Sequence, residues 1–235
     1  MQILASKFIY PNDIVDMEAT LSPFRNMAIQ LSFFQKNDFF QIDHRKIKKI
    51  TDSFNITIPT IHAPTVDIFN HEFFDIIRVI KDFYKVSLIT IHPQKGDDAV
   101  ALAKFEEHVS VINNLGVILA YENFPSRIGR RKWIHLAQEM YVKFDLPFLK
   151  ITFDTSHLDD PKSCIDEFEA VADKVAVVHL SDQDGENQHQ PLGTGKVPYK
   201  QFMRCLEEAG FSGPIVIEYM PEYESKLISD VNGFR

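Results

Sequence analysis

Short apolar runs alternate along this chain with longer segments in which apolar residues recur every three or four positions. The short runs are rich in Ile, Val, Leu and Phe and span six or seven residues, which is typical of buried strands. Turn-forming or polar residues separate most of the runs from the segments that follow them. We expect eight strands, at residues 2–7, 26–32, 56–62, 86–92, 117–122, 149–154, 175–181 and 214–219.

The longer segments have the spacing of helices with one apolar face. Phe73, Ile76, Ile77, Ile80 and Phe83 follow the i, i+3, i+4, i+7 pattern that buries one side of a helix. The pattern predicts helices at residues 11–22, 43–54, 71–83, 98–115, 131–145, 163–173, 197–209 and 223–231. Because a strand and a helix alternate eight times, the sequence favours a closed parallel (β/α)8 TIM barrel of the α/β class. An open doubly wound sheet is the alternative.

Nothing along the chain marks a boundary between domains. The alternation is not interrupted by a linker rich in Pro, Gly or Ser, and 235 residues is a normal length for one such barrel. We therefore expect a single domain over residues 1–235. The string Gly193-Thr194-Gly195-Lys196 is not a phosphate-binding loop, because its first glycine is misplaced and neither Ser nor Thr follows the lysine.

Composition narrows the class of protein without naming an activity. Hydrophobic residues make up 45% of the chain and charged residues 25%, which indicates a soluble globule with a large core. The formal net charge of −8 argues against general affinity for nucleic acids. There is no apolar stretch of the roughly 20 residues that a membrane span needs, and no signal peptide at the start, so a cytoplasmic location is expected. Size and charge permit a monomer or a homodimer.

The two cysteines, Cys164 and Cys205, fall inside predicted helices. They are expected to be inert buried thiols in a reducing compartment.

Most of the predicted strands end on a residue that can bind a metal ion. Six such residues are His62, His92, Glu122, Asp154, His179 and Glu218. The carboxyl ends of all strands in a parallel barrel open on one face, so these side chains should converge there. His157 and His189 follow two of the strands and belong to the same face. The other histidines lie in or beside predicted helices, where surface or packing roles are expected, and are His44, His71, His108 and His135.

The donor types at this face indicate a divalent metal. Histidine combined with carboxylate, without cysteine, suits Zn²⁺ or Mn²⁺ rather than Mg²⁺ or Ca²⁺. One ion could take the quartet of Glu122, Asp154, His179 and Glu218. A second ion could take His62 and His92, with Glu122 as a bridge. His157 and His189 would then hold a third ion or bind the substrate, so one to three ions are expected.

Several strings, which run in order from the third predicted strand to the eighth, resemble one superfamily. They are Ile61-His62-Ala63-Pro64, Ile91-His92-Pro93, Glu122-Asn123, Phe153-Asp154-Thr155-Ser156-His157, His179-Leu180-Ser181-Asp182, His189-Gln190-Pro191-Leu192-Gly193-Thr194-Gly195 and Glu218. In this order they resemble the xylose isomerase-like barrels, which include sugar isomerases, sugar epimerases and endonuclease IV. The strings are specific for the superfamily, not for one activity within it.

In the sugar-converting members, the resemblance implies that the quartet holds one metal ion. Glu122 and Glu218 would act as acid and base, moving a proton at the carbon next to a metal-held carbonyl. His157 would contact a hydroxyl of the substrate. An arginine that often follows the histidine of the seventh strand in such epimerases is missing after His179.

Endonuclease IV resembles this chain at more positions. Its three-zinc site would map onto His62, His92, Glu122, Asp154, His157, His179, His189 and Glu218. Asn187 stands where that enzyme has an aspartate ligand, so the resemblance implies a weak or absent third ion, with Asn187 as a poorer ligand or a substrate contact. The acidic stretch Asp182 to Glu186 is expected to repel a phosphate backbone.

Two further features bear on the substrate. Arg127, Arg130 and Arg131 cluster near a predicted helix start, where positive charge opposes the helix dipole. This makes sense if they bind an anion such as a sugar phosphate or a DNA phosphate, while a solvated surface run is the alternative. The aromatic stretch 33–40 could insert into a nucleic acid, although such clusters more often pack under a loop.

These features favour a metal-dependent sugar or sugar-phosphate isomerase or epimerase, with a small carbohydrate or phosphorylated substrate. The alternative is an endonuclease IV-like multi-zinc phosphodiester hydrolase acting on abasic DNA. A barrel that binds a ligand without turnover is a third class, which the intact quartet disfavours. His62 and His92 discriminate between the first two, because a one-ion isomerase does not need them.

Overall fold

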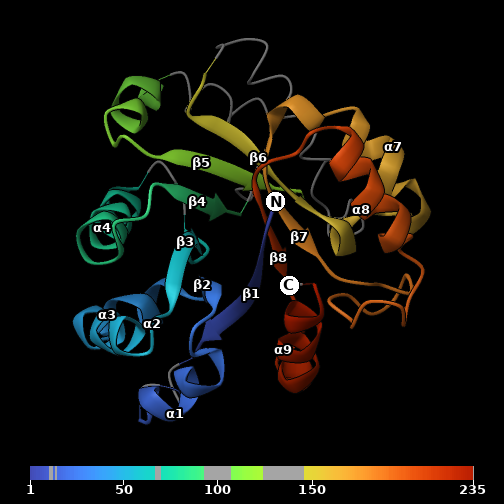
Figure 1. Cartoon of the computed structure of the whole chain (residues 1–235). Coiled ribbons are helices and arrows are strands. Elements are labelled where there is room, and N and C mark those ends of the chain that lie inside the picture. The colour runs from blue at the N-terminus through green and yellow to red at the C-terminus, as the bar shows by residue number, and fades with distance from the viewer. Residues whose placement is uncertain (11–12, 14, 67–69, 93–106, 124–145, 235) are drawn as a thin grey trace.

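The computed structural model describes residues 1–10, 13, 15–66, 70–92, 107–123 and 146–234. Within these residues, eight parallel strands close into a barrel in the order in which they occur in the chain (Figure 1). They are β1 (Gln2–Ile9), β2 (Ala28–Phe33), β3 (Thr57–His62), β4 (Leu88–Ile91), β5 (Ile118–Glu122), β6 (Leu149–Asp154), β7 (Val175–Leu180) and β8 (Pro214–Ile217). β8 pairs with β1 and closes the ring. The predicted (β/α)8 barrel is confirmed, and the open sheet is excluded.

Helices surround the barrel on its outer face (Figure 1). The α-helices are α1 (Met17–Leu21), α2 (Lys36–Gln41), α3 (His44–Ser53), α4 (His71–Val79), α7 (Cys164–Glu169), α8 (Tyr199–Glu208) and α9 (Glu224–Gly233), and residues 107–113 are also helical. Polar caps begin several of them: the side chains of Asp43 and Asn70 accept hydrogen bonds from the first turns of α3 and α4.

Several helices differ from the prediction. The helix expected at 11–22 is the short α1, which Pro23 converts into a 3₁₀ turn over Ser22–Phe24. The helix expected at 71–83 is α4, which continues as a π-helical turn over Ile80–Tyr84. α2 was not predicted. The helix expected at 131–145, and residues 98–106 of the one expected at 98–115, lie outside the described residues.

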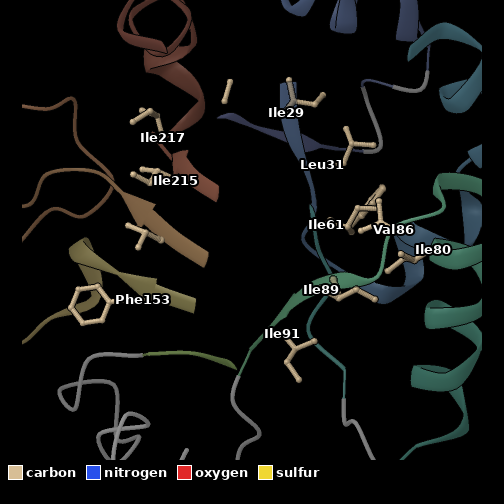
Figure 2. Packing of buried hydrophobic residues seen from close by; sticks show 14 of the residues in the cluster. Ile29, Leu31, Ile61, Ile80, Val86, Ile89, Ile91, Phe153, Ile215 and Ile217 are labelled. Atoms are coloured by element: carbon tan, nitrogen blue, oxygen red, sulfur yellow. The ribbon is translucent and has the colours of Figure 1, made fainter. Parts of the chain in front are cut away.

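The main core lies between the strands and the helices. Ile61 and Ile89 point outward from neighbouring strands and, with Ile80, fill the space toward α4 (Figure 2). All three side chains are fully buried. Because side chains alternate between the two faces of a strand, the residues between these apolar positions must point into the barrel. This alternation delivers the polar residues of the strand ends to the barrel interior.

Inside the barrel, a small apolar cluster of Leu4, Ala120, Val177 and Val216 fills the space below the mouth. Ala120, Val177 and Val216 each lie two residues before a predicted metal ligand on the same strand. The ligands therefore stand on a closed floor rather than over an open channel.

Cys164 and Cys205 are buried in α7 and α8, as predicted. None of the described helices is both long and apolar enough to cross a lipid bilayer.

Candidate metal centre

The side chains predicted to bind metal meet at the carboxyl-terminal mouth of the barrel. They form three groups: His62 with His92 and Glu122; Glu122 with Asp154, His179 and Glu218; and Asp154 with His157 and His189. Within each group, the ligand atoms all lie within 4.8 Å of one another. Glu122 and Asp154 each belong to two groups. We refer to these as the first, second and third ligand groups.

A register shift helps to assemble the second group. The pairing of β6 with β7 slips by one residue between Ile151 and Thr152, after which Asp154 lies beside His179. The two side chains therefore point into the barrel at the same level, although a regular register from Ile151 onward would have placed Asp154 beside Val178.

The second group has more negative charge than its protein partners can satisfy. His179 Nδ1 lies 2.6 Å from Glu122 Oε1, 2.7 Å from Glu218 Oε2 and 3.7 Å from Asp154 Oδ2. All four side chains are buried. Nδ1 can carry one proton, so it can donate to only one of these carboxylates. Within the described structure, Asp154 Oδ2 and Glu218 Oε2 have no hydrogen-bond partner. A divalent cation bound by all four side chains would satisfy these oxygens.

The electrostatics of the second group agree with this assignment. Burial lowers the pKa of His179, but the carboxylates of Glu218 and Glu122 outweigh burial and raise it well above the usual value. Burial raises the pKa of Glu122, but the charge of His179 and its hydrogen bond bring it well below the usual range. The protein alone thus sets three buried carboxylates against His179 and, at Glu122, His62, and a bound ion would replace the proton of His179.

The first group meets the second at Glu122. Its Oε1 faces His179, whereas its Oε2 lies 3.3 Å from His62 Nε2 and 3.0 Å from His92 Nε2. His62 Nδ1 donates to the carbonyl of Ala63 at 3.0 Å, which directs Nε2 toward the carboxylate. His92 Nδ1 is 2.7 Å from Thr65 Oγ1 and is oriented in the same way. The two oxygens of Glu122 therefore face different groups, as in a bridging carboxylate.

The third group contains two histidines held nitrogen to nitrogen. His157 Nδ1 donates to the carbonyl of Asn123 at 2.9 Å, so its Nε2 is directed to His189 Nε2, 3.1 Å away. Two imidazole nitrogens at this distance must share either a proton or a cation. Asp154 supplies the carboxylate of the group. His189 has a left-handed backbone with φ 54°, an uncommon conformation for a residue with a side chain.

Asn187 takes no part in the geometry that the resemblance implied. Its side chain is exposed, and its Nδ2 donates to Asp184 Oδ2 at 2.9 Å within the same loop. The carboxylate of the third group comes instead from Asp154. The weak or absent third ion stays a prediction.

The acidic stretch from Asp182 to Glu186 has a structural role that its charge did not suggest. The fully buried Asp182 accepts hydrogen bonds from the backbone N–H groups of Gln183, Gly193 and Val197, each at 2.9 Å. A Cβ on Gly195 would lie 2.4 Å from Asp182 Oδ1, so the glycine-rich string is a turn wrapped around this carboxylate. The expectation that this stretch faces and repels a phosphate is corrected for Asp182, which faces the loop interior.

Two residues that support the site were not among the candidates. Gln30, fully buried on β2, brings its amide nitrogen to 3.1 Å and its amide oxygen to 3.3 Å from His179 Nε2. Asn123 accepts from the backbone N–H of Asp154 at 2.6 Å and donates to its carbonyl at 2.9 Å. The signal for Gln30 was a polar residue in the middle of an apolar strand. Contacts of this kind orient metal ligands.

A cavity of about 290 Å³ opens above the ligands. Its floor is formed by His62, His92, Glu122, His157, His189 and Glu218. Its other side is formed by Phe8, Tyr10, Phe33, Phe34, Tyr219 and Met220, which we call the apolar wall, with Pro221 beside them. The predicted anion-binding residues Arg127, Arg130 and Arg131 lie outside the described residues.

Comparison with known proteins gives a matching family, relatives by sequence and similar solved structures. The model of a family described as a xylose isomerase-like TIM barrel matches residues 27–230. An uncharacterized protein of Methanocaldococcus jannaschii is 26% identical over 223 residues, covering 83% of this chain and 80% of the relative.

Two solved structures illustrate the range of activities on this fold. The 3-keto-D-glucoside 4-epimerase of E. coli aligns with a TM-score of 0.72 at 11% identity, covering 100% of this chain and 98% of that one. An AP endonuclease, family 2, from Brucella melitensis aligns with a TM-score of 0.71 at 14% identity, covering 93% of this chain and 92% of that one. At such identities the likeness establishes the fold and leaves the reaction to be argued from the site.

Proposed function

This chain belongs to the xylose isomerase-like TIM barrel family, and from that premise we propose that it is a metal-dependent enzyme whose multinuclear centre hydrolyses a phosphate ester. The observation that carries the proposal is the position of Glu122, whose two carboxylate oxygens face different ligand groups. A one-ion isomerase needs the second group alone. Four further histidines around the same cavity support the multi-ion alternative over the isomerase that the sequence favours.

Each ligand group would hold one ion. The first ion would be bound by His62, His92 and Glu122, the second by Glu122, Asp154, His179 and Glu218, and the third by Asp154, His157 and His189. The donors suit Zn²⁺ or Mn²⁺. Bound ions of this kind supply Lewis-acid chemistry, which activates water and neutralises charge on the phosphoryl and leaving oxygens.

The chain's own residues would position the reactants and move one proton. In hydrolysis, the oxygen of water attacks phosphorus, the bond from phosphorus to the leaving oxygen breaks, and the leaving oxygen takes up a proton. Glu218 lines the cavity floor and is a candidate to accept the proton of the attacking water. Burial raises the pKa of Glu218, but the charge of His179 lowers it by a larger amount. The carboxylate is therefore ionised at neutral pH.

Isomerase or epimerase activity is the second candidate, and a specific observation favours it. Glu122 and Glu218 approach the same nitrogen of His179 at 2.6 and 2.7 Å. Two carboxylates beside one metal position form the pair that would remove a proton from one side of a carbon and return it from the other. In this reaction Glu122 and Glu218 would be the catalytic base and acid, with His157 on a substrate hydroxyl.

Metal counting combined with two activity assays tests the proposal. Purified protein loaded with Zn²⁺ would be analysed for bound ions and assayed with bis(p-nitrophenyl) phosphate and with an abasic-site duplex. Isomerase activity would be followed as deuterium uptake from D₂O into ketose phosphates. Two or more ions per chain and phosphodiester cleavage are expected, and cleavage of the duplex would identify DNA as a substrate. One ion with deuterium uptake and no hydrolysis would establish the second candidate instead.

A further inference from the structure

The cavity above the ligands has two chemically different sides. The ligand floor comes mainly from β3 to β7, whereas the apolar wall comes from β8, β1 and β2 and the residues that follow them. These three strands are neighbours, because β8 pairs with β1 and β1 pairs with β2 (Figure 1). The wall is therefore one continuous surface on the side of the mouth opposite β4 to β6.

The back of this wall is rigid. Phe33 is 2% exposed and packs edge-on against Phe39, with ring centroids 4.9 Å apart and an interplanar angle of 87°. Tyr219 is 3% exposed, and its hydroxyl donates to Asp230 Oδ2 at 2.8 Å. Side chains fixed in this way lose little conformational entropy when a ligand binds.

The rim of the wall is exposed. Phe34 is 56% and Met220 is 43% exposed, although both side chains are large and apolar. Exposed apolar side chains gathered at a cavity mouth mark a ligand-binding surface. The backbone N–H of Met220 donates to the carbonyl of His189 at 3.0 Å, so this rim is tied directly to a residue of the third ligand group.

The wall favours one type of chemical group. Its side chains Phe8, Phe33, Phe34 and Met220 offer dispersion and ring contacts and no hydrogen bonds, and the hydroxyl of Tyr219 is already bonded to Asp230. These side chains suit a flat ring better than a polyol. A cavity of about 290 Å³ lies at the small end of ligand pockets, so it suits a small substrate.

We propose that the substrate carries a planar ring next to its phosphate ester, and that Phe34 and Met220 contact this ring while the phosphate lies on the ligand floor. This inference rests on the proposed function, because the phosphate is assigned to the floor by it. A nucleobase and a simple aryl group share the required chemistry.

Binding measurements on the Zn²⁺-loaded protein test the inference, and phosphate release measured in the same samples separates binding from turnover. Phenyl phosphate, adenosine monophosphate and ethyl phosphate would be titrated by calorimetry. We expect the two ring-bearing phosphates to bind about tenfold more tightly than ethyl phosphate, and Phe34→Ala or Met220→Ala each to reduce that advantage about three- to tenfold. Tighter binding of adenosine monophosphate than of phenyl phosphate would identify a nucleobase, and equal binding a simple aryl group.

Phe40→Ala is the matched control. Phe40 is 47% exposed on α2 and does not line the cavity, so the ring preference should be unchanged. Thermal melts of the exposed-residue variants check that each one folds. Equal binding of ethyl and phenyl phosphate would overturn the inference, as would a ring preference that survives both Phe34→Ala and Met220→Ala.

The failures of the two proposals are distinguishable. Hydrolysis without ring preference would overturn the inference and leave the proposed function standing. Ring preference in binding without hydrolysis of any phosphate ester would overturn the function and retain the ring site.

Discussion

Replacing His92 by alanine separates a multi-ion centre from a one-ion centre. His92 Nε2 lies 3.0 Å from Glu122 Oε2, and the first ligand group contains one other histidine, His62. The variant would leave that group with two ligands, too few to retain an ion, while the second and third groups keep all of theirs. We therefore expect one fewer ion per chain.

We expect a large effect on the rate and a small effect on the fold. The His92 side chain is 17% exposed beside the cavity, so water can fill the space that alanine leaves and the fold should be little affected. The lost ion would have stabilised charge in the transition state by several kcal/mol. A loss of about 4 kcal/mol corresponds to about a thousandfold decrease in kcat.

Elemental analysis after dialysis measures the ion count, and hydrolysis of bis(p-nitrophenyl) phosphate measures the rate. His71→Ala is the control, since His71 is exposed at the start of α4 and belongs to none of the ligand groups. An unchanged ion count for His92→Ala, with a rate within about threefold of the parent, would refute the multi-ion reasoning, since that difference is under 1 kcal/mol.

Three other perturbations probe the same centre. Glu122→Gln removes the carboxylate shared by two groups, and we expect it to release two ions and abolish activity, as measured by elemental analysis and steady-state kinetics. Gln30→Met keeps the volume but removes the amide beside His179, and we expect zinc affinity to fall about 10- to 100-fold in chelator competition. Because Glu218 and Glu122 raise the pKa of His179, this ring is protonated at neutral pH and zinc must displace the proton. Zinc affinity should therefore rise with pH, by about tenfold per unit below that pKa, in calorimetric titrations.

Each of these expectations has an outcome that contradicts it. Retention of all ions by Glu122→Gln would mean that the groups are independent. Recovery of zinc affinity by Gln30→Glu, which restores an acceptor, would support the orienting role, and equal losses in both variants would indicate a packing defect. A zinc affinity independent of pH would show that His179 is neutral before the ion binds.

The barrel could be predicted because its signal is local and repeated. In Thr60-Ile61-His62, the apolar residue faces the helices and the two polar residues face the interior, and the same alternation recurs around the ring. α2 lacked such a signal, since Phe39 is its one buried residue. The change from α4 to a π-helical turn at Ile80 likewise has no signal in the periodicity, because Ile80 and Phe83 continue the apolar spacing of the helix.

The candidate site was predictable as a set of residues but not as a geometry. Strand order alone brings Glu122 and His179 to one face. Which oxygen of Glu122 faces which histidine depends on the register, including the slip beside Thr152 that aligns Asp154. The contact of Gln30 with His179 joins residues 149 positions apart and has no local pattern. The roles assigned to these residues remain predictions.

His189 differs from the ligands that precede it in the chain, because it is supplied by a loop with a left-handed backbone and not by a strand end. That loop is held by the buried Asp182, by a hydrogen bond from Met220 to His189 and by one from Gln188 to Ser156, whereas the strand ligands belong to the cooperative barrel. Segments of this kind open locally at lower free energy than a core sheet. Brief opening of the loop would leave the first and second groups whole, so the proposed ions would differ in lability: the third would exchange with solution while the other two stay in place.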